Sequence, residues 1–283
     1  MKLIINADDA GIDEARNRGI FKCVDVGMVK NLSVVVCQAG WQDIIVRLRG
    51  RKDISAGLHF NLTAGRPLRE GFKTICGQDG SFFNKFELLK RSLSGFIDTQ
   101  EVIEEMTAQL DALRQAGIDI SHVDGHNHVH LLPGVREAAR TVLPQKMRVR
   151  LAFERRAGVS KPMVNDYVKV YNDPAQLVSL LNFLSQEAKK IWGDRFLHAD
   201  DFAGTAVTPQ PGLQILEQAI KGLKGEICEL MCHPGDEPDE GSVPFSRLYG
   251  RQEELRMLTS TEFREFLMKR GIKIVSYRDI APK

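Results

Sequence analysis

The chain has 283 residues, of which 43% are hydrophobic and 27% charged, and its 39 Lys and Arg nearly balance its 37 Asp and Glu to give a net charge of +2. This composition is ordinary for a globular protein and supplies ample apolar material for a core. The near-balance of charge argues against a general binding surface for nucleic acid or anionic membranes.

The N-terminal stretch MKLIINADDAG has a short apolar run interrupted by Asn and two Asp, which fits neither the length nor the order of a signal peptide. No other segment approaches the roughly 20 apolar residues of a membrane span. The five cysteines are an odd number without a Cys-x-x-Cys pair, which favours reduced thiols. We therefore expect a cytoplasmic protein.

Short apolar segments rich in β-branched residues alternate with helical patterns along the chain. The predicted strands are 2–6, 32–36, 54–62, 120–124, 147–153, 195–200, 226–232 and 272–277. Such continuously apolar strands are typical of parallel sheets that are buried on both faces. Because closure of seven or eight β-then-α units leaves no sheet edge, the pattern predicts a single α/β domain over residues 1–283, of the TIM-barrel-like type.

Capping residues and glycines mark three of the helices between these strands. The predicted helical segments are 99–117, 208–223 and 259–271, of which the second begins with Thr-Pro and the third with a capping box. Two irregular stretches, 65–94 and 234–250, are predicted to be long loops of the kind that often bind substrate or act as lids.

The segment SHVDGHNHVHLLPG, residues 121–134, holds four of the seven histidines: His122, His126, His128 and His130. We interpret it as the end of a strand that runs into a loop, with Pro133 opening the next helix. Solvated or capping histidines are the alternative. Asp124, two residues before His126, favours a ligand site instead.

Further polar residues follow other predicted strands: Asp8, Asp9, His59, Asp200, Asp201 and His233. The carboxyl ends of parallel barrel strands converge on one rim, where barrel enzymes place their chemistry. Taken singly, the aspartates could be helix caps or loop braces and the histidines core residues. Two adjacent carboxylates are costly unless a cation or a donor offsets them, so the joint pattern favours a polar site.

Two histidines and one carboxylate form an open site for a divalent metal, at which bound water has a pKa near 7. A second carboxylate can then serve as general base, and a further histidine can protonate a leaving group. This inventory predicts hydrolysis of an amide or ester. It fits a phosphoester less well, because no arginine cluster or glycine-rich anion loop stands out. The residues alone leave open which of Asp8 and Asp9 is the ligand and which the base.

Five motifs resemble those of the YdjC-like carbohydrate deacetylases, a family that includes chitooligosaccharide deacetylases: NADDAG, GLHFNLTAGRPL, SHVDGHNHVHLLP, ELMCHPG and VSYRDI. They run in order from residue 6 to residue 280. The resemblance implies a distorted (β/α) barrel related to polysaccharide deacetylases, one divalent ion (Mg²⁺ or Zn²⁺), often a homodimer, and a short N-acetylated sugar such as diacetylchitobiose as substrate.

The same resemblance assigns roles to individual positions. It implies that Asp9, His59 and His126 bind the metal, that Asp8 is the base that activates water, and that His233 is the acid that protonates the departing amine.

Arg148 matches a family arginine that orients the base or contacts substrate, and Arg150 is a rival for that role. Two other functions stay open at this point. One is another metal-dependent hydrolase, such as a phosphoesterase, and the other is a sugar-binding protein without catalytic activity.

Overall fold

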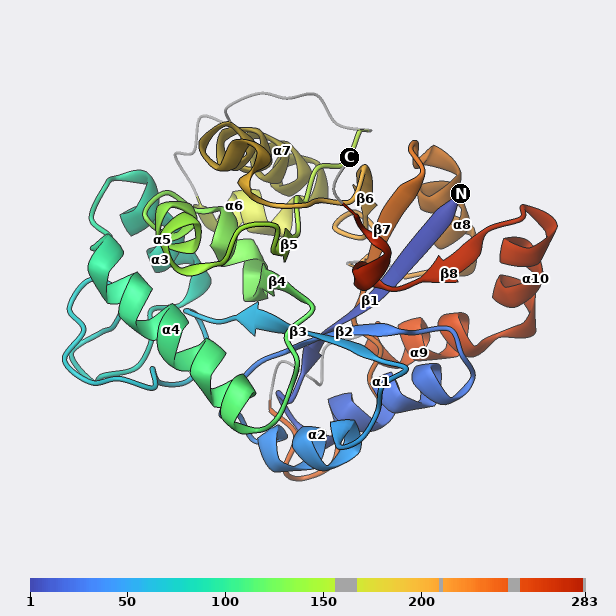
Figure 1. Cartoon of the computed structure of the whole chain (residues 1–283), viewed down its shortest axis with the longest axis horizontal. Helices are drawn as coiled ribbons and strands as arrows, with labels where there is room; N and C mark the ends of the chain where they lie inside the picture. Colours follow the sequence, from blue (N-terminus) through green and yellow to red (C-terminus); the bar gives the residue numbers. More distant parts are fainter. Residues whose placement is uncertain (156–166, 209–210, 244–249, 282–283) are drawn as a thin grey trace.

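A sheet of parallel strands surrounded by helices forms the centre of the computed structural model, which describes residues 1–155, 167–208, 211–243 and 250–281 (Figure 1). The strands are β1 (Lys2–Ala10), β2 (Asn31–Val34), β3 (Ser55–Phe60), β4 (His122–Gly125), β5 (Arg148–Val149), β6 (Asp201–Ala203), β7 (Ile227–Cys232) and β8 (Lys273–Val275). Their order in the sheet is β5-β4-β3-β2-β1-β7-β6, and β8 pairs with β1.

The sheet curls into a distorted barrel, as predicted. On one edge of β1, β8 pairs with the first half of the strand and β2 with the second half. The segment 197–200 connects the two ends of the sheet: the Val149 backbone NH donates to the Leu197 carbonyl at 2.9 Å, and the Asp200 NH donates to the Ile227 carbonyl at 2.7 Å. The strands therefore enclose an interior that the outer helices do not reach.

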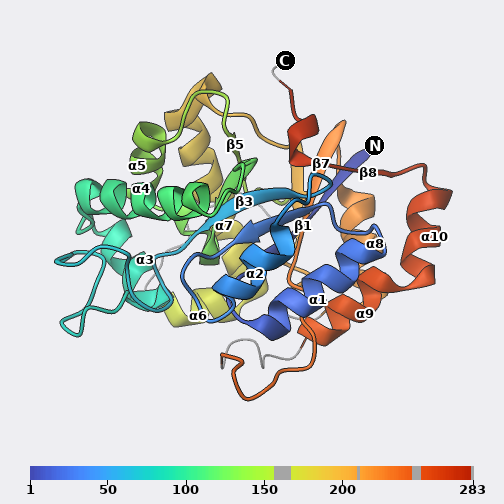
Figure 2. The ribbon, with the colours of Figure 1, turned by 60° about the horizontal axis from the view of Figure 1, so that its bottom comes forward.

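The helices pack around the outside of the barrel. They are α1 (Glu14–Asp25), α2 (Trp41–Leu48), α3 (Lys85–Leu93), α4 (Thr99–Gln115), α5 (Val135–Val142), α6 (Tyr167–Asn172), α7 (Pro174–Trp192), α8 (Leu213–Gly222), α9 (Arg251–Thr259) and α10 (Thr261–Lys269). Figure 2 shows α1 beside α9, which brings the two halves of the chain together. The main apolar core lies between these helices and the outer face of the sheet.

The helix ends agree with the sequence in part. Helix α4 begins at Thr99 as predicted, with Asp98 as its N-cap. Helix α10 is capped by Ser260, whose hydroxyl accepts from the Phe263 NH, so the predicted capping box at Thr259 is wrong by one residue. Helix α8 begins at Leu213, four residues after the first helical position predicted at Pro209, and residues 209–210 of the prediction lie outside the described residues.

The predicted strand 195–200 is wrong, because the strand in this region, β6, starts at Asp201. Asp200 therefore lies at the amino end of the neighbouring strand, where its Oδ2 accepts from the NH groups of Glu226 and Ile227 at 2.9 Å each. Asp201 accepts from the Lys224 NH at 2.9 Å. Both aspartates brace the turn before β7 and lie away from the predicted rim.

Two expectations from composition can be compared with the structure. The five cysteines are all free, which agrees with the prediction of reduced thiols. Among the helices of the described residues, none combines the length and the apolar character that crossing a bilayer requires.

The inside of the barrel is polar, which is unusual because barrel interiors are mostly filled with branched apolar residues. The side chains bonded to one another there, each at most 1% exposed, are Asn6, Ser33, His122, Asp124, Arg150 and Glu229. Tyr277, which follows β8, closes the amino end of the barrel and stacks on the His122 ring with 3.9 Å between ring centroids. This buried polar column leads toward the carboxyl ends of the strands, where the candidate site lies.

Candidate active site and metal centre

A bulge at the end of β1 turns two consecutive carboxylates toward the barrel. In a regular strand successive side chains point to opposite faces, so Asp8 and Asp9 would diverge. The pairing of β1 with β2 shifts register between Ala7 and Ala10, and Asp9 has a φ of 67°. A β-bulge re-aims side chains in this way, and left-handed backbone at a residue other than glycine is strain of the kind found at functional sites.

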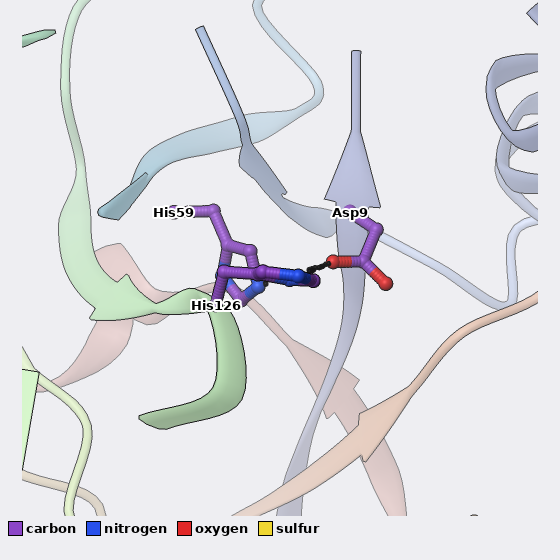
Figure 3. A group of neighbouring side chains, drawn as sticks. All are labelled: Asp9, His59 and His126. Carbon is purple, nitrogen blue, oxygen red and sulfur yellow. Dashed lines mark hydrogen bonds and ion pairs between the residues drawn. The ribbon is translucent and has the colours of Figure 1, made fainter. Parts of the chain in front are cut away.

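Asp9, His59 and His126 form a buried group of potential metal ligands (Figure 3). Asp9 Oδ1 lies 2.8 Å from His126 Nδ1 and 3.3 Å from His59 Nε2. One ligand atom from each residue lies within 4.8 Å of the other two. The three side chains come from β1, β3 and the turn after β4, so the fold brings together the three positions that the sequence predicted as ligands.

Asp124 fixes the orientation of His59. Its Oδ1 lies 2.7 Å from His59 Nδ1, which leaves Nε2 directed at Asp9. Burial alone lowers the pKa of His59, but the carboxylates of Asp124 and Asp8 outweigh burial and raise it to about 10. A carboxylate behind a histidine is the usual second-shell support of a metal-binding imidazole, and a cation at Nε2 would release the proton there.

The two neighbouring aspartates have different electrostatic surroundings. Burial raises the pKa of the Asp9 carboxyl, but the imidazoles of His126 and His59 hold it well below its usual range. For Asp8 burial prevails over the opposing effect of Arg150, and the pKa of its carboxyl is raised. Asp9 is thus an anion between two imidazoles, whereas Asp8 is a carboxyl of higher basicity beside it.

Arg150 binds the Asp8 carboxylate through both terminal nitrogens of its guanidinium group. Arg150 Nη1 donates to Asp8 Oδ2 at 2.6 Å and Nη2 donates to Asp8 Oδ1 at 2.7 Å, while Asn6 Nδ2 donates to Oδ1 at 2.7 Å. Arg150 Nη2 also lies 2.8 Å from Asp124 Oδ2. Asp8, His59 and Asp124 form a second possible ligand group, but the guanidinium already lies between the two carboxylates and disfavours a cation there.

Arg148, predicted to bind substrate, is not among the residues that the structure brings to this cluster. Its Nε donates to the Ile280 carbonyl at 3.0 Å and its Nη2 to the Arg278 carbonyl at 3.1 Å. These contacts tie β5 to the C-terminal segment. The rival Arg150 occupies the position beside Asp8 instead.

Only one of the four clustered histidines reaches the ligand group. After β4 the chain turns into η1 (His126–Leu131), in which Asn127 and His128 have φ values of 53° and 57°. This strained turn, and not an extended run, directs His126 at Asp9. Pro133 lies two residues before α5, so the prediction that it opens the helix is wrong.

The other three clustered histidines are buried structural residues. His122 Nε2 pairs with Ser33 Oγ at 3.0 Å, and His130 Nε2 donates to the Arg150 carbonyl at 3.1 Å. The His128 ring packs edge-on against Phe202. These three histidines are therefore neither ligands nor the solvated or capping residues of the alternative, but buried parts of the core.

His233 follows β7 and is held by α9. Its backbone NH donates to Glu254 Oε2 at 2.5 Å, and its Nδ1 lies 3.9 Å from Glu254 Oε1. Burial lowers the pKa of His233 well below its usual range, Arg251 lowers it further, and Asp9 opposes both. Asp9 is thus among the charges that act on His233, and the lowered pKa makes the imidazole neutral near pH 7.

A row of side chains on α4 anchors the loop after β3. Glu105 accepts from the Leu68 NH at 3.0 Å, Glu101 accepts from the Thr74 NH at 2.8 Å, and Gln109 Nε2 donates to the Asn61 carbonyl at 2.8 Å. The first part of the predicted loop 65–94 is therefore tied to α4. Its last part forms helix α3, so the prediction of a loop is wrong there. Of the second predicted loop, residues 244–249 lie outside the described residues.

The sequence placed Asp124 beside His126 without predicting its contact with His59, and it did not single out Glu229 or Glu254. Glu229 carried a usable signal, because an acid within a continuously apolar strand is buried and needs a partner. Glu254 lies in an ordinary polar helix and carried none.

Comparisons with known proteins agree with this architecture. The family model described as YdjC-like protein matches residues 2–269. A carbohydrate deacetylase of Homo sapiens is 31% identical, with 100% of this chain and 92% of the relative covered. A carbohydrate deacetylase of Clostridium beijerinckii is 25% identical, with 99% and 100% covered.

A crystal structure from Enterococcus faecalis V583, whose description provisionally assigns it to cellobiose-phosphate cleavage, superimposes with a TM-score of 0.71 at 21% identity. The alignment covers 98% of this chain and 97% of that one, a likeness that shows the fold alone. Fold, family model and full-length relatives agree, and the chain belongs to the YdjC-like protein family.

Proposed function

We propose that this protein is a metal-dependent carbohydrate deacetylase that hydrolyses the acetamide of an N-acetylated amino sugar. A short chitin-type oligosaccharide such as N,N'-diacetylchitobiose is the proposed substrate. The relatives named carbohydrate deacetylase support the reaction class. The observation that carries the proposal is the buried group Asp9, His59 and His126 with Asp8 beside it.

The donor set fits a divalent cation. Two imidazoles and one carboxylate leave coordination positions open for water and substrate, and imidazole donors favour zinc over magnesium. Asp124 behind His59 completes the ligand arrangement that such sites use. When bound, the ion would polarise the acetamide carbonyl and lower the pKa of water.

Asp8 is the proposed general base, which takes the proton from the attacking water. Arg150 and Asn6 hold both carboxylate oxygens in place, so the carboxyl has one orientation. Burial raises the pKa of Asp8 against the effect of Arg150, and a higher pKa makes a carboxylate a better base near neutral pH.

His233 is the proposed acid that protonates the amine as the C–N bond breaks. Glu254 orients it through the backbone NH and faces Nδ1. Because burial keeps the imidazole neutral, it takes up a proton from solvent before it donates one to the amine, and Asp8 returns to solvent the proton that it took from water. The release of a free amino sugar and acetate then completes the reaction.

The proposal is tested by acetate release from N,N'-diacetylchitobiose after the protein is reconstituted with Zn²⁺ or Mg²⁺, with the Asp8→Asn variant and a panel of sugar phosphates in parallel. We expect acetate from the wild type, a loss of about 10²-fold or more in the variant, and no phosphate release. Phosphate release without acetate would move the protein to phosphoester hydrolysis. Binding of acetylated sugars without any turnover would make it a sugar-binding protein.

A further inference from the structure

An acidic side chain, Glu229, lies in the middle of β7 and points into the barrel. It pairs in register with Ile4 of β1 and Phe202 of β6, and it is 1% exposed. Burying a carboxyl without compensation is costly. The residue that compensates it is Arg150, which follows β5 and also binds the proposed base.

Arg150 uses all three guanidinium nitrogens. Its two terminal nitrogens bind the carboxylate of Asp8, and its Nε donates to Glu229 Oε1 at 2.7 Å. The guanidinium is planar, so a contact at Nε together with the contacts at the two terminal nitrogens fixes rotation about the Cδ–Nε bond. Without the contact at Nε, the guanidinium group could rotate and turn its terminal nitrogens away from Asp8, although its positive charge would remain inside the barrel.

Other contacts of Arg150 do not supply this constraint. The Phe202 ring lies below the guanidinium, with its centroid 5.6 Å from Arg150 Cζ, and such a contact tolerates rotation of the plane. His130 contacts only the Arg150 backbone carbonyl. Asp124 contacts Nη2, the same terminal nitrogen that donates to Asp8, so it does not hold the guanidinium at Nε.

The charge balance indicates that Glu229 contributes geometry more than charge. Four charged or titratable groups act on Glu229: Asp8 of β1, Asp124 of β4, Arg150 directly after β5, and Tyr277 after β8. Burial raises the pKa of Glu229 to about 7, against the opposing effect of Arg150. Asp8 and Asp124 already neutralise the guanidinium, and either protonation form of Glu229 offers a carbonyl-type oxygen to Nε.

We infer that Glu229 is a positioning residue, which holds Arg150 in the orientation that aligns Asp8 for proton abstraction. The inference rests on the proposed function of Asp8. Among the described residues, the side chain of Glu229 bonds to Arg150 and not to Asp9, His59 or His126, so we expect its effect to pass through the Arg150 guanidinium. It follows that a neutral acceptor of the same shape should replace it, whereas an apolar side chain of similar size should not.

Three variants separate these possibilities in the acetate-release assay with metal-reconstituted protein. Glu229→Gln keeps an acceptor for Nε, and we expect its kcat within about 3-fold of the wild type. Glu229→Met fills the space without an acceptor, and kcat should fall about 10- to 100-fold with KM within about 3-fold, as expected for a misaligned base. Glu226→Gln, at an exposed glutamate of the same segment, is the control and should match the wild type.

Thermal melting and metal content are measured on each variant. If Glu229→Met does not fold, Glu229→Asp replaces it, because a side chain one methylene group shorter cannot reach Nε, and the expectation is the same. Wild-type kcat in Glu229→Met or Glu229→Asp would overturn the inference, and so would a Glu229→Gln variant as slow as Glu229→Met. Wild-type protein that releases no acetate would overturn the proposed function and this inference with it.

Discussion

At the scale of single residues, the site depends on two adjacent carboxylates that the backbone and their partners make different. The bulge turns Asp9 toward His59 and His126, and Arg150 takes Asp8. Imidazoles and a carboxylate together suit a metal, whereas a carboxylate held by a guanidinium keeps a fixed direction for proton transfer. The division into ligand and base, which the residues alone left open, thus has a physical basis that supports the proposed roles.

Glu229 gives the folded protein a pH dependence that can be measured without substrate. Its pKa is about 7 in the folded protein and 4.5 ordinarily, so between these values the folded state keeps a proton that the unfolded chain has lost. The stability that wild type holds relative to Glu229→Gln should therefore fall by a few kcal/mol as pH rises from about 4.5 to about 7.

Urea unfolding of the two metal-free proteins at about pH 5 and about pH 7.5 measures this difference. Asp8, Asp124 and Tyr277 are present in both proteins, so to first order their own titrations cancel in the comparison. A difference in the free energy of unfolding that stays constant between the two pH values would contradict a raised pKa at Glu229.

Single residues also show where sequence reasoning ends. Asp8, Asp9, His59 and His126 could be singled out because unusual polar residues follow apolar strands, and the structure brings them together. Asp124, Glu229 and Glu254 act through other side chains, and which side chain each one meets depends on strand register, which no local pattern specifies.

At the scale of elements, β5 is only two residues long, yet it and the residue after it place two arginines with different partners. Arg148 bonds to backbone carbonyls of the C-terminal segment, whereas Arg150 bonds to the carboxylates. Arg148→Lys and Arg150→Lys are thus a matched pair, since each keeps the charge and removes the fork.

We expect kcat to fall about 100-fold in Arg150→Lys and to stay within about 3-fold of the wild type in Arg148→Lys, because only the first change loosens Asp8. Acetate release at saturating substrate measures both, with thermal melting as the check on folding. Equal losses of kcat in the two variants, with folding intact, would show that Arg148 has the role that the sequence resemblance implied.

The elements themselves were predictable where local patterns are strong. Helix α4 has a stripe of apolar residues and a clear start, and β3 and β7 are short, mostly apolar segments that are buried almost throughout. The predicted strand 195–200 is wrong because Leu197 joins β5 only through an isolated bridge, and continuous pairing with β7 begins at Asp201. Apolar composition marks burial there, but it does not say which neighbour supplies the hydrogen bonds.

At the scale of the whole molecule, alternating strands and helices predicted a barrel. The chain forms a barrel in which two strands pair with the same edge of β1. β8 and β2 divide one side of β1 between them, and the segment 197–200 closes the opposite side. This distortion depends on contacts between distant parts of the chain and was not visible in any local pattern. The interior of this barrel holds the buried polar side chains that support the site.

The proposed division of labour between Asp8 and Asp9 is tested most directly by measuring bound metal and acetate release in Asp8→Asn and Asp9→Asn side by side. Asparagine tolerates the left-handed backbone of Asp9, so the bulge should persist in that variant. We expect Asp8→Asn to retain its metal and lose acetate release, and Asp9→Asn to lose both. Loss of metal from Asp8→Asn, or an Asp9→Asn variant that still binds metal as the wild type does, would contradict the account.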